Sequence, residues 1–179
     1  MGWFSNTSTA NRIQNTGTIA ACVGLLTANE LILQGVNEFV DEQITRGNQL
    51  SAKAFSVEGT SSRLGRDLQS AMGTLNNLKS QTARQLQQLD EVTDCMAVMI
   101  QQFELPRGAR TLNMSGKQMA NSAEDMTNKA LNELGSLVEN YRSRIITSIE
   151  TIDRADQTLH PSSYTRASLT MPGMNLQRR

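Results

Sequence analysis

The sequence predicts an all-α fold: a long antiparallel helical hairpin of coiled-coil type, a further N-terminal helix, and extended polar arms at both ends. Apolar residues recur over 64–103 at alternating four- and three-residue steps, the repeat of a coiled-coil helix. A second apolar seam follows after Pro106. Hydrophobic residues make up only 38% of the 179 residues, which suits narrow helix–helix seams better than a thick globular core.

Residues 1–17 are expected to form an irregular arm, because Ser, Thr and Asn dominate the segment and bond their own backbone in competition with helix. Trp3 and Phe4 are a candidate anchor for a membrane interface or a partner groove. The alternative is that they pack on the protein's own surface. The start is close to an N-myristoylation motif, but Asn6 stands where the motif needs Ser or Thr, which argues against lipidation.

A first helix is expected over 18–46. Gly47 after a basic Arg46 is typical of a helix C-terminus. The first half of this helix has no charge before Glu30 and is apolar on several faces, so it requires burial on more than one side. The longest strictly apolar run, Ile19–Leu26, is shorter than the ~20 residues of a spanning helix, and we do not expect a conventional integral membrane protein.

A second helix is expected over 50–103. Gly59 and the Thr and Ser residues after it are poor helix formers, since Gly costs about 1 kcal/mol relative to Ala. They predict a kink or break near 58–62, where Ser61 or Ser62 would cap a new start.

A third helix is expected over 113–159, after a short connection that contains Pro106 and Gly108. So short a connection requires the two helices to lie antiparallel. The seam of the third helix advances in steps of three, four and four residues, a longer period than that of the second. Because two such helices cannot match along their whole length, the remaining apolar surface falls to the first helix or to another chain.

The seams of the hairpin supply the candidate interface residues. Thr82 and Gln85 interrupt the first seam, and polar layers can fix register. We favour a shift of the stripe onto Leu86, which leaves only Thr82 inside and buries no amide. The candidate interface residues are Leu64, Leu68, Leu75, Leu78, Leu89, Val92, Met96, Met99, Phe103, Leu134, Leu137, Tyr141, Ile145 and Ile152.

Methionines gather at the turn end of the hairpin, where Met96, Met99, Met119 and Met126 fall on the seams. We interpret them first as core residues that fill irregular gaps. The alternative is a deformable apolar tip, completed by Phe103, that binds a partner or a bilayer.

Residues 160–179 contain two prolines, three arginines and no acidic residue, and they predict a basic extended tail. The segment is either a disordered tail or a strap that docks on a neighbouring subunit or an acidic surface. The expected organisation is thus an arm (1–17), an elongated three-helix bundle (18–159) and a tail.

Catalytic equipment is sparse. The one histidine, His160, has Asp156 four residues before it, and the pair fits a cation at a helix C-terminus better than a catalytic site. No zinc, Glu-x-x-His, EF-hand or nucleotide-binding pattern occurs. Acidic clusters at 90–94 and at Glu150 with Asp153 are interpreted as solvated helix faces. We expect no enzymatic activity, no cofactor and no metal.

The charge balance and the cysteines give weaker indications. With 17 basic and 17 acidic residues, no global field recruits nucleic acid, and no specific nucleic acid is predicted. Cys22 and Cys95 form no framework and fit inert thiols in a reducing compartment. No secretory signal is visible, so we expect synthesis in the cytoplasm and incorporation into a particle.

These features favour a structural subunit that self-associates through its helices as a homo-oligomer within a larger particle. The composition, rich in Ala, Gln, Ser and Met, is similar to that of helix-rich internal and tail-associated phage proteins, although no motif is shared. That likeness implies a virion component. Two alternatives remain: a membrane-active helical protein that contacts the membrane through its N-terminus, and a soluble coiled-coil adaptor.

Overall fold

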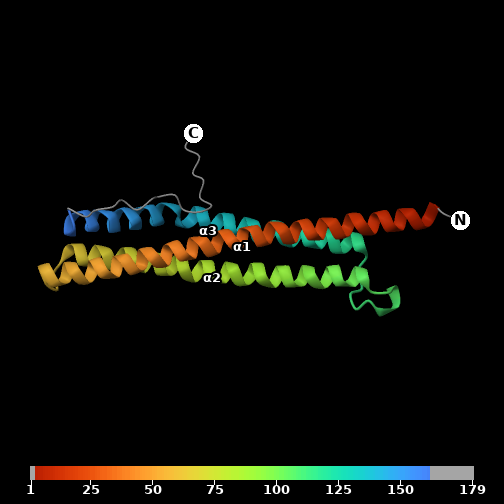
Figure 1. The fold of residues 1–179 in the computed structure, drawn as a ribbon, viewed down its shortest axis with the longest axis horizontal. Coiled ribbons are helices and arrows are strands. Elements are labelled where there is room, and N and C mark those ends of the chain that lie inside the picture. The colour runs from red at the N-terminus through yellow and green to blue at the C-terminus, as the bar shows by residue number, and fades with distance from the viewer. Residues whose placement is uncertain (1–2, 162–179) are drawn as a thin grey trace, which may run out of the picture. The chain divides into compact units, whose positions relative to one another are not determined.

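The computed structural model describes residues 3–161, with side chains from residue 9 onward except that of residue 107. The chain forms α1 (Trp3–Glu58), α2 (Arg63–Glu104), the short 3-10 helix η1 (Arg107–Ala109) and α3 (Gly116–Leu159) (Figure 1). No strand occurs in the described part of the chain. The all-α prediction is confirmed.

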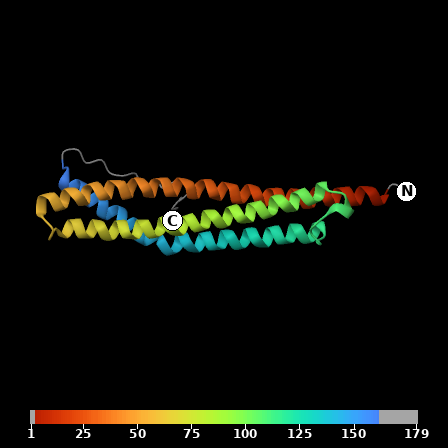
Figure 2. The same cartoon turned by 90° about the horizontal axis from the view of Figure 1, so that it is seen from below.

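The chain divides into two compact units, each built from segments of all three helices. Unit 1 comprises residues 1–31 and 85–135, and unit 2 comprises 32–84 and 136–179. Within each unit the α2 segment runs antiparallel to the α1 and α3 segments, as both views show (Figures 1 and 2). The antiparallel arrangement of the two hairpin helices is therefore confirmed.

Unit 2 is held together by a core to which all three helices contribute. Leu75 is fully buried at its centre, with Phe39 and Tyr141 among the partly buried residues packed around it. The apolar residues lie three or four positions apart on each helix, so each helix turns one continuous side inward. The buried members are Val36, Val40, Leu50, Leu68, Leu75, Leu78, Ile145, Ile149, Ile152 and Ala155.

Unit 1 buries Met96, Met99 and Met119, whereas Met126, the fourth methionine of the seams, is half-buried. Met96 and Met119 have no exposed surface, and Phe103 is 4% exposed, so the interpretation of these residues as core is confirmed. Leu105, just beyond α2, stays exposed. The buried apolar residues of this unit are Ile19, Cys22, Leu26, Leu89, Met96, Met99, Phe103, Met119, Ala120, Ala123, Ala130 and Leu134.

The N-terminal segment differs from the expected irregular arm, because residues 3–17 belong to α1. Two of the threonine hydroxyls bond to the backbone of the same helix. Thr16 donates to the carbonyl of Arg12 at 2.9 Å, and Thr18 donates to that of Gln14 at 3.2 Å. These bonds to the carbonyl four residues earlier are compatible with a continuing helix, so the side chains do not compete with it.

The expected helix end at Gly47 is also wrong, because α1 continues through it to Glu58. Gly47 is buried, and a Cβ built there would lie 3.0 Å from Cγ of Met72 and 3.5 Å from Cδ1 of Ile152. Its small size lets the helices approach closely, which is a packing role and not a termination signal.

The break predicted near 58–62 is confirmed, but it separates α1 from α2 and does not bend one helix. Gly59 has φ of 78°, a left-handed conformation that favours glycine. The amide of Gly65 donates to Oγ of Ser62 at 3.0 Å, so Ser62 caps α2 as expected. Residues 50–58 therefore complete α1, and the second helix begins at Arg63 and not at residue 50.

A buried glutamine and a capping box organise the connection between α2 and α3 in unit 1. Oε1 of Gln102, which is 4% exposed, accepts from the amides of Thr111 at 2.9 Å and Leu112 at 3.3 Å. Ser115 and Gln118 cap each other's amides reciprocally, at 2.8 and 3.2 Å. This box starts α3 at Gly116, later than the expected residue 113.

The third helix ends at Leu159, as expected. Residues 162–179 lie outside the described residues, and the predicted basic tail falls almost wholly within them.

Candidate interaction surface on helix α1

An ionic cluster in unit 2 joins α1 to the end of α3. The guanidinium of Arg46 pairs with Asp153 at 2.7 Å and with Asp156 at 2.5 Å. Nδ1 of His160 lies 3.0 Å from the carboxylate of Asp156, so the pairing of these two residues is confirmed. Lys53 donates to the last helical carbonyl, that of Leu159, at 3.2 Å.

Burial alone would raise the pKa of Asp156, but hydrogen bonds from Arg46 and His160, with their charges, outweigh it and lower the pKa below its ordinary value. The pKa of Arg46 is raised: burial opposes the charge, and its bonds to Asp156 and Asp153 more than compensate. The prediction that Asp153 lies on a solvated face is wrong, because it is 8% exposed and paired. The cluster is satisfied by its own members, which fits a structural role.

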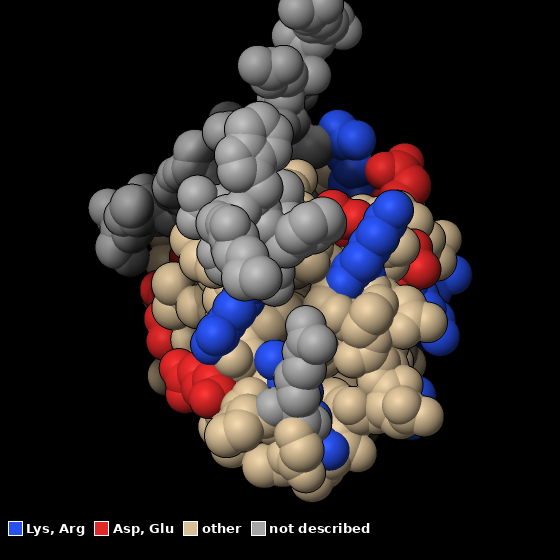
Figure 3. Space-filling view, turned by 90° about the vertical axis from the view of Figure 1, so that its right-hand side faces the viewer, with Lys and Arg blue, Asp and Glu red and all other residues tan. Residues whose placement is uncertain are grey.

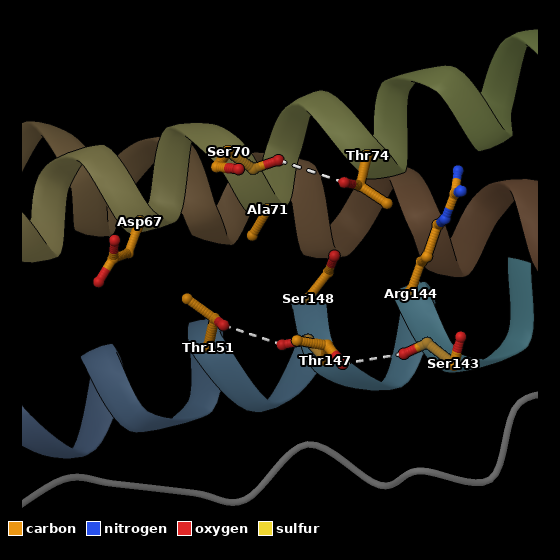
Figure 4. Close-up of a pocket in the computed structure, with 9 residues that line it drawn as sticks. All are labelled: Asp67, Ser70, Ala71, Thr74, Ser143, Arg144, Thr147, Ser148 and Thr151. Atoms are coloured by element: carbon orange, nitrogen blue, oxygen red, sulfur yellow. Dashed lines mark hydrogen bonds between the residues drawn. The ribbon is translucent and has the colours of Figure 1, made fainter.

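A groove of about 370 Å³ lies between α2 and α3 in unit 2 (Figure 4). Asp67 and Arg144 lie toward opposite ends of it, and most of the other lining residues carry hydroxyls. The hydroxyls of Thr74, Thr147 and Thr151 donate to the carbonyl four residues earlier in their own helices. These three hydroxyls are therefore already used within their own helices.

No group of three or more His, Cys, Asp or Glu side chains that could hold a metal ion occurs within the described residues. The expectations that the chain is not an enzyme and needs no cofactor stay predictions.

The candidate interface residues lie inside the chain's own units. Leu68, Leu75 and Ile152 have no exposed surface, and the half-buried members, such as Val92 and Tyr141, lie at the edges of the packed faces. Thr82 is buried as predicted, with its hydroxyl 3.0 Å from the carbonyl of Lys79 and paired with Asn37. The seams therefore stabilise the fold of the single chain, and a surface for contact with a partner lies elsewhere.

That surface lies on α1. Between Arg12 and Glu38 the helix carries one charged residue, Glu30. Every exposed residue from Gly17 to Ile32 is Gly, Ala, Leu, Ile or Thr. We define the α1 apolar face by its exposed residues Ile13, Gly17, Ala20, Ala21, Gly24, Leu25, Ala28, Leu31 and Ile32.

The α1 apolar face is open to its surroundings. Ile13 is 68% exposed, Leu31 64% and Leu25 53%. A Cβ built on Gly17 or Gly24 would meet no atom within 4 Å. The start of α1 extends beyond the ends of α2 and α3 in both ribbon views (Figures 1 and 2), and the surface seen from that end shows uncharged residues interspersed with Lys, Arg, Asp and Glu (Figure 3).

Measured over an 18-residue window, α1 reaches a mean hydropathy of 1.6, and only 28% of that window is buried. By length and composition, this helix could cross a membrane. The strict apolar run Ile19–Leu26 understated this property, because isolated residues such as Thr27 and Asn29 interrupt a longer apolar segment. Trp3 and Phe4, the candidate anchor, lie in α1, and their side chains are outside the described part.

No family model, no curated protein and no solved structure matches this chain.

Proposed function

We propose that this protein is a non-enzymatic structural subunit that self-associates through its helices within a larger particle, with a virion or phage component as the first candidate. The observation that supports the proposal is the uncovered apolar face of α1. Contiguous apolar surface on a soluble protein marks an interaction site. A helix that is apolar on several sides needs partners on more than one side, and the chain's own α2 and α3 segments cover only part of α1.

Two other features of the described residues give weaker indications of a contact site. Arg46 and its two aspartates satisfy one another. The groove hydroxyls of Thr147 and Thr151 bond their own helix. The choice of a virion over another particle is supported by the overall composition.

Light scattering over a concentration series tests self-association. We expect the wild-type mass to be a multiple of the 19.7 kDa of one chain and the variant Leu31→Glu to have the mass of a monomer, because a charge cannot be buried in an apolar contact without a partner. Val98→Glu is the matched control, since Val98 is exposed on α2 of the same unit. A stable wild-type monomer at tens of micromolar would overturn the proposal.

A further inference from the structure

We propose that the partner of the α1 apolar face is a lipid bilayer: the chain docks this face on the membrane interface with α1 lying along the surface. The inference rests on the proposed function only in taking the same face as the contact surface. It commits to lipid as the functional occupant.

The first argument is the chemistry of the exposed side chains. From Gly17 to Ile32 the exposed residues are apolar or small, and Thr27 is the most polar of them. Hydrocarbon excludes charge and offers no hydrogen-bond partners. A face without charge is therefore complementary to the acyl boundary of a bilayer, where apolar helix faces bury about 5–10 Å deep.

The second argument is the position of the one charge. Glu30 lies four residues after Leu26 and three before Leu33, so it shares their side of the helix. Leu26 and Leu33 are buried in the protein, at 0% and 3% exposure, and Glu30 is half-buried. Docking through the α1 apolar face leaves this carboxylate on the protein side, whereas a spanning α1 would carry it into hydrocarbon at a cost of several kcal/mol. The geometry thus favours docking over spanning.

The third argument is the breadth of the face. Leu25 and Leu31 are six residues apart, so they point about a third of a turn away from each other. Both are more than half exposed, and Ala28 lies exposed between them. A helix that pairs with a second helix in water has a narrow seam, with charged flanking positions that select partner and register. This face is broad and has no charged residue among its exposed positions, so a fluid lipid surface, which requires no fixed register, can cover all of it.

The fourth argument is extent. Residues 13–37 span about 37 Å at the rise of an α-helix, and Glu30 is the only charge among them. The hydropathy of α1 reaches the range of membrane segments, yet little of the apolar window is used for the internal core. The chain's own cores use only part of this nearly uncharged stretch, and a bilayer surface is long enough to cover the rest.

Flotation of the full chain with neutral phosphatidylcholine vesicles tests the proposal. We expect the wild type to float with the vesicles, at low and high salt alike, because the contact is apolar. The double variant Leu25→Glu with Leu31→Glu should bind about tenfold less or weaker still, since two side chains lose their apolar contact. Val98→Glu, exposed on α2 of the same unit, should float as the wild type does. Unchanged helical circular dichroism and melting temperature establish that each variant is folded.

Several outcomes would overturn the inference: a wild type that stays unbound, equal flotation of the double variant, or binding that requires anionic lipid and disappears in salt. The light-scattering result separates this failure from that of the proposed function. If light scattering shows wild-type oligomers that Leu31→Glu dissociates, and the wild type does not float with vesicles, then the occupant is a second copy of the chain. That result would refute lipid docking and leave the proposed self-association standing. Flotation of a chain that is monomeric in buffer would support lipid docking and refute self-association.

Discussion

Replacing Arg46 with methionine removes the charge that binds two aspartates of α3 while keeping much of the apolar stem. Its side chain is 21% exposed, and those of Asp153 and Asp156 are 11% and 19% exposed. The variant leaves two poorly hydrated carboxylates close together without their cation. Breaking a buried ion pair in this way costs 3–5 kcal/mol, and because these side chains keep some contact with water we expect about 3 kcal/mol.

The matched control is Lys79→Met. Lys79 lies 2.5 Å from Asp41, the same separation as Arg46 from Asp156, but the two side chains are 46% and 51% exposed. An exposed pair contributes less than about 1 kcal/mol whatever its length. The comparison therefore separates the effect of burial on the ion pair from the effect of the distance between its charges.

Thermal unfolding followed by circular dichroism measures both variants. For a chain of this size, 1 kcal/mol corresponds to about 2–4 °C, so Arg46→Met should melt about 6–12 °C below the wild type and Lys79→Met within a few degrees of it. Equal losses in the two variants would refute the reasoning that burial makes the cluster important.

The loss should also depend on pH. The pKa of Asp156 is lowered in the folded protein from an ordinary value of 3.8, so its ionised form contributes stability that is complete above that value and is lost as pH falls through the folded pKa. The gap between wild type and Arg46→Met should be full at neutral pH, begin to narrow below about pH 4 and close only below the lowered pKa of Asp156. A gap that persists unchanged at pH 2 would contradict this assignment.

The remaining predictions concern packing and accessibility. Gly65→Ala should lower the free energy of unfolding by about 1–3 kcal/mol, because the new Cβ would lie 2.7 Å from the ring of Phe55. Gly73→Ala should raise it by up to about 1 kcal/mol, because a Cβ there would meet no atom within 4 Å. Chemical denaturation measures both changes and distinguishes their signs. Leu75→Ala should cost about 2–5 kcal/mol by the same assay, since the side chain is fully buried in the core of unit 2. A thiol reagent should modify the exposed Cys95 rapidly in the folded protein and the buried Cys22 only on unfolding. Equal modification rates would contradict the burial of Cys22 in unit 1.

Much of the fold follows from local pattern. The three- and four-residue spacing that includes Leu75 and Ile145 identifies the sides that become the cores, because helical periodicity alone determines which residues share a side. Pro106 and the Gly59–Ser62 segment coincide with helix ends in the structure, because their effect on the backbone is local.

The errors arise where a partner distant in sequence decides. Gly47 has the local signature of a helix end. Its role in close helix packing depends on Met72 and Ile152, which are distant in sequence. Asp153 belongs to an acidic cluster in the sequence, and only Arg46, on another helix, buries it. The Ser115-x-x-Gln118 capping box is the one missed feature with a local signal that identifies it in the sequence.

The candidate surface was partly predictable. The sequence indicates that the first half of the N-terminal helix is apolar on several sides, but periodicity cannot tell which side its own chain covers. The structure covers the side of Ile19 and Leu26 and leaves that of Leu25 and Leu31 open.

The central claim is that a partner covers the α1 apolar face, and an environment-sensitive fluorophore on that face tests it most directly. The label is attached to Leu31→Cys in a Cys95→Ser background, where Cys22 is buried, and a second protein carries it on Val98→Cys. We predict blue-shifted emission at position 31, on raising the protein concentration or on adding phosphatidylcholine vesicles, with no shift at position 98. Emission at position 31 that remains characteristic of water under both conditions would contradict the claim.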